Sequence, residues 1–194
     1  MTPGRPIEYD RERSLQRAIE VFWQRGYEGA SLSELCESTG LSKSTLYAVF
    51  GDKRGLFLSS VQAYSDQLLS TFSTAYAEAG SPLEFISDVL NGVAAEARPG
   101  GDLKGCLVLN SATELAQTDP DVARIVAQAL DGMAEVFESA LTRGMRAGEL
   151  AELPARATAL YLVSTVAGMK TMVKAGRTEQ ELRRVAKLVL KQLI

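Results

Sequence analysis

Five polar side chains fall within a stretch of six residues: Ser42, Lys43, Ser44, Thr45 and Tyr47. Their hydroxyl groups can both donate and accept hydrogen bonds, and the lysine ammonium adds a positive charge. Side chains of this kind reach the base edges and phosphate oxygens of a DNA duplex, and the dipole at a helix start adds attraction for anions. The plain alternative is a solvent-exposed helix face that binds nothing.

Two short helices joined by a glycine turn are predicted to position this polar segment. Ser31 and Glu34 are spaced as a capping box, which predicts that a first helix begins there. Gly40 can take positive φ without a Cβ clash and is expected to end that helix, while Ser42 is expected to cap a second one. The positions expected to face the core are Leu32, Leu35, Cys36, Leu46, Val49 and Phe50. This helix-turn-helix pattern leaves the polar segment facing outward and favours DNA contact over a merely solvated face.

The segments around the turn also resemble a known family. They are Ala18-Ile19-Glu20-Val21-Phe22, Arg25-Gly26-Tyr27, Ser31-Leu32-Ser33-Glu34-Leu35, Thr39-Gly40-Leu41-Ser42-Lys43-Ser44-Thr45-Leu46-Tyr47 and Phe50-Gly51-Asp52-Lys53. Through them the stretch from Asp10 to Leu69 resembles the DNA-binding domain of the TetR/AcrR family of bacterial transcriptional regulators. The resemblance implies that the helix with Ser42 to Tyr47 is the recognition helix and that Lys53 opens the next helix and meets a phosphate. Arg54 departs from the acidic residue common in relatives and adds positive charge beside Lys53.

Helical periodicity extends over the rest of the chain and predicts an all-α fold. An apolar stripe that begins at Leu15 and ends at Gly26 supplies a further helix to the N-terminal domain. We expect an N-terminal arm and a three-helix helix-turn-helix DNA-binding domain at residues 1–55, and a larger helical effector-binding and dimerisation domain at residues 56–194. Helices of the larger domain are expected to begin near Ser81, Gly105, Asp119, Ala155 and Thr178.

Composition and charge narrow the functions open to the chain. Its 194 residues, 46% hydrophobic content and formal net charge of −3 suit a globular protein without a bulk basic surface. Residues 1–60 hold equal numbers of basic and acidic side chains, so attraction to DNA is expected from a local patch of Lys43, Lys53 and Arg54. So weakly charged a module would gain from two copies acting together.

The chain lacks the residues that several other functions usually require. The chain has no histidine, which removes the commonest general base and metal ligand, so we expect no enzyme, no metal site and no cofactor. Cys36 and Cys106 are far apart and do not suggest a secreted disulfide framework, and Cys36 is expected to be structural. The longest uncharged helical stretch, Ala157 to Met169, is shorter than the ~20 residues that span a bilayer, so a cytoplasmic protein with no membrane partner is expected.

The last two predicted helices carry more apolar surface than one subunit would need. The segment from Ala155 to Ala175 is apolar nearly all the way round, and the segment after Thr178 is amphipathic. We expect them to form a four-helix bundle with a second copy, which the family resemblance also implies. The alternative is that both helices close the core of their own subunit. A two-fold dimer would place two recognition helices in successive major grooves of double-stranded DNA and predicts a near-palindromic site.

The larger domain is expected to hold an unknown small-molecule effector, as it does in relatives, where binding releases DNA by favouring one of two conformations. The candidate lining residues, which ordinary core packing would explain equally well, are Phe85, Val89, Leu109, Thr113, Met133, Phe137, Tyr161 and Met169. Cys106 stands out because backbone N–H groups at a predicted helix start, and the preceding Lys104, stabilise a thiolate. The segment resembles that of a TetR subgroup in which some members respond to oxidants or electrophiles, and Lys174 is a candidate electrostatic partner. Free cysteines are more often simply buried hydrophobic residues.

Two functional classes follow from these observations. The first is a dimeric repressor released from DNA by a small molecule, an oxidant or an electrophile, and repression is favoured because it is the common mode in the family. The second is a helical small-molecule-binding or thiol-reactive protein with no DNA role, whose ligand binding would be unaffected by replacing Lys43, Thr45 and Tyr47 with alanine. Arg5 is a further candidate DNA contact, because basic N-terminal arms can enter a minor groove, although a short basic arm is more often simply disordered.

Overall fold

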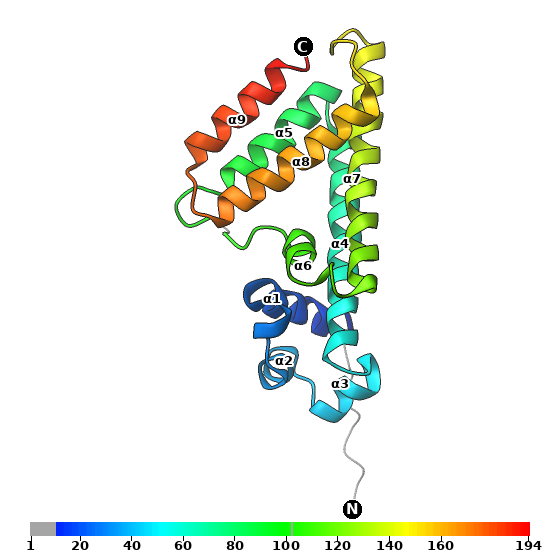
Figure 1. The fold of residues 1–194 in the computed structure, drawn as a ribbon, viewed down its shortest axis with the longest axis vertical. Helices are drawn as coiled ribbons and strands as arrows, with labels where there is room; N and C mark the ends of the chain where they lie inside the picture. Colours follow the sequence, from blue (N-terminus) through cyan, green and yellow to red (C-terminus); the bar gives the residue numbers. More distant parts are fainter. Residues whose placement is uncertain (1–10, 102) are drawn as a thin grey trace, which may run out of the picture. The chain divides into compact units, whose positions relative to one another are not determined.

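Helices make up the regular structure of residues 11–101 and 103–194, which are the residues described in this computed structural model. They are α1 (Arg11–Gly29), α2 (Leu32–Thr39), α3 (Lys43–Phe50), α4 (Lys53–Glu78), α5 (Pro82–Ala95), α6 (Leu107–Leu115), α7 (Pro120–Arg146), α8 (Ala155–Lys174) and α9 (Glu179–Lys191). The predicted all-α fold is confirmed, and no strand occurs within the described ranges (Figure 1). None of the described helices combines the length and the apolar character needed to cross a membrane.

The chain divides into two compact units at a point inside α4. The first unit extends to Ala63, and the second runs from Tyr64 to Ile194. The boundary expected from the sequence, between residues 55 and 56, falls in the first turn of the same helix, which begins at Lys53. Because α4 continues through the division, it supplies residues to the cores of both units.

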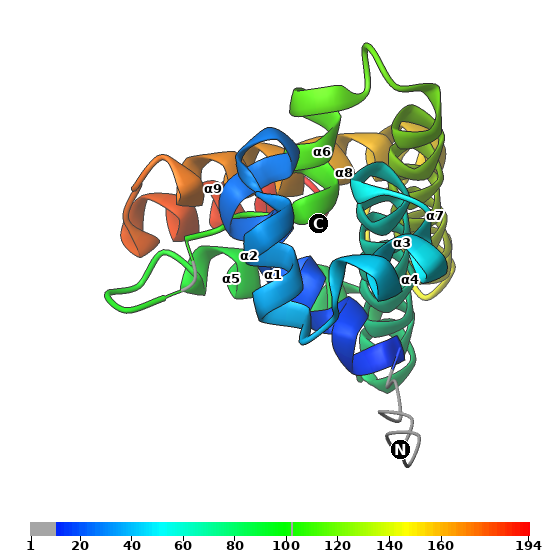
Figure 2. The same cartoon turned by 90° about the horizontal axis from the view of Figure 1, so that it is seen from below.

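The core of the first unit is a small cluster of aliphatic and aromatic side chains. Leu35 of α2, Leu46 of α3 and Phe57 of α4 are each at most 1% exposed. Phe22 of α1 meets Phe57 edge to face, with ring centroids 5.0 Å apart. The sequence predicts that the first helix ends at Gly26; φ is 73° there, but after this break helical structure continues to Gly29. The short helices and their turns are seen most directly in Figure 2.

Local hydrogen bonds determine where α2 begins and ends. Ser31 Oγ accepts the backbone N–H of Glu34 at 3.1 Å, as expected for an N-cap. The reciprocal half of the predicted capping box is wrong, because the Glu34 carboxylate accepts from Arg25 Nε at 3.1 Å instead. Gly40 ends the helix in the left-handed region, with φ 73° and ψ 13°. The helix-turn-helix geometry therefore rests on contacts between residues close in sequence.

The second unit packs its helices around a larger apolar core. Figure 1 shows α5, α8 and α9 running alongside one another, and α9 packs on α5 while α8 packs on α7. Phe72 of α4, Phe85 of α5 and Phe137 of α7 form an aromatic centre with ring centroids 5.0–5.7 Å apart. The caps predicted at Ser81 and Thr178 are formed, and each side-chain oxygen accepts a backbone N–H three residues later. The apolar faces predicted from periodicity therefore meet in one core.

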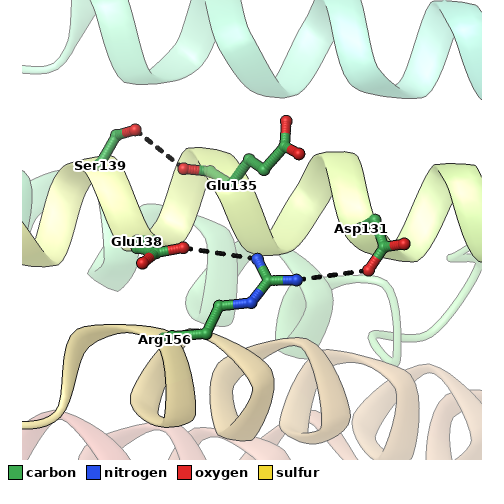
Figure 3. A network of polar contacts seen from close by, with 5 residues as sticks. All are labelled: Asp131, Glu135, Glu138, Ser139 and Arg156. Atoms are coloured by element: carbon green, nitrogen blue, oxygen red, sulfur yellow. Dashed lines mark hydrogen bonds and ion pairs between the residues drawn. The ribbon is translucent and has the colours of Figure 1, made fainter.

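A surface network of ion pairs joins α7 to α8. Arg156 of α8 donates to Asp131 and to Glu138 of α7, each at 3.4 Å (Figure 3). On the side of α7 away from α8, the Ser139 hydroxyl donates to the backbone carbonyl of Glu135. Because the Arg156 side chain is 46% exposed, solvent screening limits the bridge to about 0–1 kcal/mol. The network helps to keep the two helices in register, while the apolar core supplies most of the stability.

Candidate DNA interface and effector cavity

The start of α3 is organised by three hydroxyl groups. Ser42 Oγ accepts the backbone N–H of Thr45 at 3.1 Å, which caps the helix. The same oxygen lies 2.9 Å from Ser44 Oγ and 2.8 Å from Thr45 Oγ1. The first-turn N–H groups of a helix also attract anions. Polar groups and a favourable dipole are therefore combined at one end of α3.

The buried side of α3 is narrower than the sequence pattern predicts. Leu46 is 0% exposed and Phe50 is 9% exposed, and both anchor the helix to the first unit. The prediction that Val49 belongs to this core is wrong, because it is 37% exposed. A residue three positions after Leu46 lies about 60° around the helix axis from it, on the side away from Phe50. A helix of two turns therefore buries the i, i+4 pair and leaves the flanking position in solvent.

The opposite side of α3 presents the predicted DNA-contacting residues. Lys43, Ser44 and Tyr47 are exposed, and Thr45 is half-buried beside the cap. The Lys43 ammonium lies 5.8 Å from the centre of the Tyr47 ring, so the two side chains of adjacent turns lie close together. Sequence reasoning missed Ala48, which is exposed one turn after Ser44. Its side chain is apolar and gives no polar signal, although an alanine methyl can contact a thymine methyl in the major groove.

Lys53 is held against the first helix of the unit. Its ammonium lies 4.6 Å from the centre of the Tyr27 ring and 3.5 Å from the carbonyl oxygen of Glu28, to which it donates. Asp52 caps α4 by accepting the backbone N–H of Gly55 at 2.7 Å. The lysine is therefore positioned before any ligand arrives. The other predicted contact, Arg5, lies outside the described residues.

A cavity of about 560 Å³ lies within the second unit. Its wall is formed by residues of α4, α5, α7 and α8 together with the start of α6. Sites that bind small molecules usually have volumes of about 300–1,000 Å³ and mostly apolar walls. The predicted effector-site residues that line it are Phe85, Val89, Cys106, Leu109 and Met133.

The remaining predicted lining residues lie elsewhere. Phe137 and Met169 are 0% and 2% exposed and belong to the packed core. Thr113 is exposed and its hydroxyl donates to backbone carbonyls of its own helix. Tyr161 is 41% exposed on the outer side of α8. Composition identifies apolar residues, but the direction in which each one points depends on the helices that surround it.

Cys106 and Tyr64 meet in the wall of the cavity. Cys106 precedes α6 as its N-cap residue and is 7% exposed. The Tyr64 hydroxyl donates to Cys106 Sγ at 3.8 Å. Burial raises the pKa of Tyr64 well above its usual 10.0, and the nearby Cys106 adds to this effect, so the phenol stays neutral. Tyr64 was missed from the sequence because it lies in an ordinary amphipathic stretch of α4.

Two lysines of α8 have different surroundings. Lys174, the candidate electrostatic partner of Cys106, lies beside Gly105 and donates to Asn110 Oδ1 at 3.0 Å. Lys170, one turn earlier, lines the cavity and forms an ion pair with Glu96 at 2.5 Å. Spacing alone cannot distinguish the two, since residues four apart lie on the same side of a helix.

The outer side of α8 is exposed and uncharged. The exposed residues on this side are Ala157, Leu160, Tyr161, Ser164, Gly168, Thr171 and Met172. Leu160 and Met172 are each 46% exposed, and Leu188 of α9 is 60% exposed. The other side of α8 packs into the core of the same chain. The sequence predicts that both sides of this helix are covered, and one of the two is covered within the chain. An uncharged side that exposes large apolar residues is typical of an interaction site.

Comparisons with known proteins point to one family. Residues 15–59 match the domain described as "Bacterial regulatory proteins, tetR family", and residues 83–189 match "Tetracyclin repressor-like, C-terminal domain". The chain is 35% identical over 147 residues to the uncharacterized HTH-type transcriptional regulator YezE of Bacillus subtilis, and the match covers 76% of each chain. It is 27% identical to the HTH-type transcriptional repressor ComR of Escherichia coli, over 97% of this chain and 90% of ComR.

A solved structure adds a view of such a protein on DNA. CifR is a TetR family transcriptional regulator, and its cysteine mutant was solved in complex with 26-bp double-strand operator DNA. The two chains are 28% identical and superpose with a TM-score of 0.83 over 98% of this chain and 100% of CifR. The prediction of a DNA-binding regulator is confirmed. The protein described by this sequence belongs to the TetR family of bacterial transcriptional regulators.

Proposed function

We propose that the protein is a repressor that binds a near-palindromic DNA site as a homodimer and leaves it when an effector acts on the second unit. The observation that carries the DNA contact is the outward face of α3. Lys43, Ser44 and Tyr47 are exposed there, while Leu46 on the opposite side is completely buried. The polar face is thus held outward by a rigid anchor, which is what recognition in a major groove requires.

The DNA contact can be tested by a mobility-shift assay with DNA flanking the protein's own gene. Lys43→Ala is expected to weaken the specific complex and to lower the slope of log K against log [salt] by about 1, if the ammonium meets one phosphate. Tyr47→Ala should weaken binding and relax the sequence preference. Arg98→Ala, which removes an exposed cation from the second unit, serves as the control. The absence of any salt-sensitive specific complex would contradict the proposal.

The proposed dimer uses the outer side of α8 together with α9. Gly168 lies in the middle of this surface, and a Cβ there would meet no atom within 4 Å, so a larger residue fits the single chain. Gly168→Glu is expected to give folded monomers with weak operator binding, because a charge would be buried in the interface. Ala127→Glu adds the same charge to an exposed position of α7 and should leave the dimer intact. Light scattering distinguishes the two outcomes, and a dimer that survives Gly168→Glu contradicts this interface.

The finer proposal is that the signal reaches Cys106. With an unsaturated carbonyl compound, Sγ would bond to the β-carbon and the thiol proton would move to the α-carbon. Hydrogen peroxide would instead convert the thiol to a sulfenic acid and release water. Cys106→Ser is expected to keep its DNA affinity but to lose release by either reagent. Unchanged release would eliminate Cys106 as the switch and leave non-covalent binding in the cavity as the signal.

A further inference from the structure

The cavity of the second unit has an excess of negative charge. Among the described residues that line it, Glu78, Glu84, Asp88 and Glu96 carry carboxylates, and Lys170 alone carries a positive charge. That cation is already paired with Glu96 at 2.5 Å. The remaining three carboxylates belong to exposed residues of α4 and α5, and we call them the rim. The lining therefore attracts cations and repels anions.

The three rim carboxylates differ in the hydrogen bonds that they already accept. Glu84 accepts the backbone N–H of Gly80 at 2.8 Å, so one of its oxygens has a structural role. Glu78 of α4 and Asp88 of α5 have neither an ion pair nor a hydrogen bond within residues 11–101 and 103–194. Because these two charges come from different helices and border the same cavity, a cation at the rim would interact with both.

The interior of the cavity has a different character. Phe72, Phe85 and Met133 contribute apolar surface, and Val166 adds to it from α8. The Tyr64 phenol in the wall is neutral, because burial and Cys106 raise its pKa. The interior therefore favours an apolar group, while the rim favours a positive charge.

We propose that the effector cavity accepts amphipathic organic cations, with the apolar body inside and the positive group between Glu78 and Asp88. This inference rests on the proposed function only in taking the cavity as the effector site. An anionic ligand of the same shape would meet the rim carboxylates and would find the Lys170 ammonium already paired. A neutral ligand would gain the apolar contacts alone.

Calorimetric titration of the full chain with three probes tests the proposal. Decyltrimethylammonium, 1,2-decanediol and decanoate each contain an unbranched chain of ten carbons and differ in charge, and each is used below the concentration at which it forms micelles. The cation is expected to bind about tenfold more tightly than decanoate, with the diol between them. Combining Glu78→Gln with Asp88→Asn should weaken binding of the cation about five- to tenfold and leave the diol unchanged.

A matched control separates a rim effect from an effect of net charge. Glu135→Gln combined with Glu152→Gln removes the same charge from exposed positions that do not line the cavity, and it should leave all three affinities unchanged. Equal affinities for the three probes, preference for decanoate, or no binding of the cation would overturn the proposal. So would a control variant that weakens the cation as much as the rim variant does. Titration requires no DNA, so failure of the proposed repressor activity would be seen separately, in the mobility shift.

Discussion

The outward face of α3 and the wall of the cavity are built in different ways. The face depends on contacts between near neighbours, such as the cap between Ser42 and Thr45 at 3.1 Å. The cavity wall brings together Tyr64, Cys106 and Lys170, which come from α4, the start of α6 and α8. An outward polar face can thus be encoded within a few residues, whereas a cavity requires the packing of a whole unit.

The largest expected effect is a loss of stability, and it should differ between the buried side and the exposed side of α3. Leu46→Ala should destabilise the first unit by about 2–5 kcal/mol and abolish DNA binding, because it empties a fully buried site below the proposed recognition face. Val49→Ala is the matched control on the same helix and should change stability by less than about 0.5 kcal/mol, since Val49 is 37% exposed. Urea unfolding followed by circular dichroism measures both. Equal losses would show that Val49 belongs to the core after all.

A pH titration tests the buried part of the cavity wall. The pKa of Tyr64 is raised in the folded protein, so its contribution to stability is complete below pH 10.0 and is lost as the pH rises above that value. The loss from this one group is at most about 1.4 kcal/mol for each pH unit. Tyr64→Phe should therefore flatten the decline in stability between about pH 10 and pH 11, relative to a variant that replaces the exposed Tyr47 with Phe. Parallel declines in unfolding free energy for both variants would contradict the burial of the phenol.

Removing one cap tests whether the proposed recognition face depends on local contacts alone. Ser42→Ala should cost about 1 kcal/mol, because the N–H of Thr45 loses its acceptor. The melting temperature should fall and DNA affinity should weaken, while binding of the decyl probes to the cavity stays the same. Ser73→Ala, at an exposed position inside α4, is the control and should have little effect. A change in probe binding caused by Ser42→Ala would mean that the two regions are not independent.

The smallest expected effect is a change in stability at two helical glycines, of which Gly92 lines the cavity and Gly144 does not. A Cβ at Gly92 of α5 would meet no atom within 4 Å, so Gly92→Ala should stabilise the protein by about 0.5–1 kcal/mol through lower chain entropy in the unfolded state. The same change at Gly144 of α7 would place the Cβ 2.5 Å from Leu150 Cδ1 and 3.2 Å from Pro82 Cβ. Gly144→Ala should therefore destabilise the protein, and thermal unfolding of the two variants should shift in opposite directions.

Parts of the larger domain were predictable for the same reason as α3. The helix starts near Ser81 and Thr178 follow from capping residues that act within three positions. Pairings over longer distances were predicted less well. The Glu34 carboxylate binds Arg25 across the bend at Gly26, and the ammonium of Lys174, a candidate partner of Cys106, donates to Asn110. The spacing of neighbouring residues does not indicate which distant side chain will form a hydrogen bond with a given polar group.

By itself the sequence determined the all-α class, the helix-turn-helix and the outward polar segment from Ser42 to Tyr47, because caps, glycine turns and helical periodicity act over about four residues. Only the tertiary structure decided that Val49 is exposed, that Phe137 and Met169 fill the core, and which apolar residues line a cavity. The reason is geometric. A residue's position along a helix follows from its sequence number, but what it faces depends on neighbours far away in the chain.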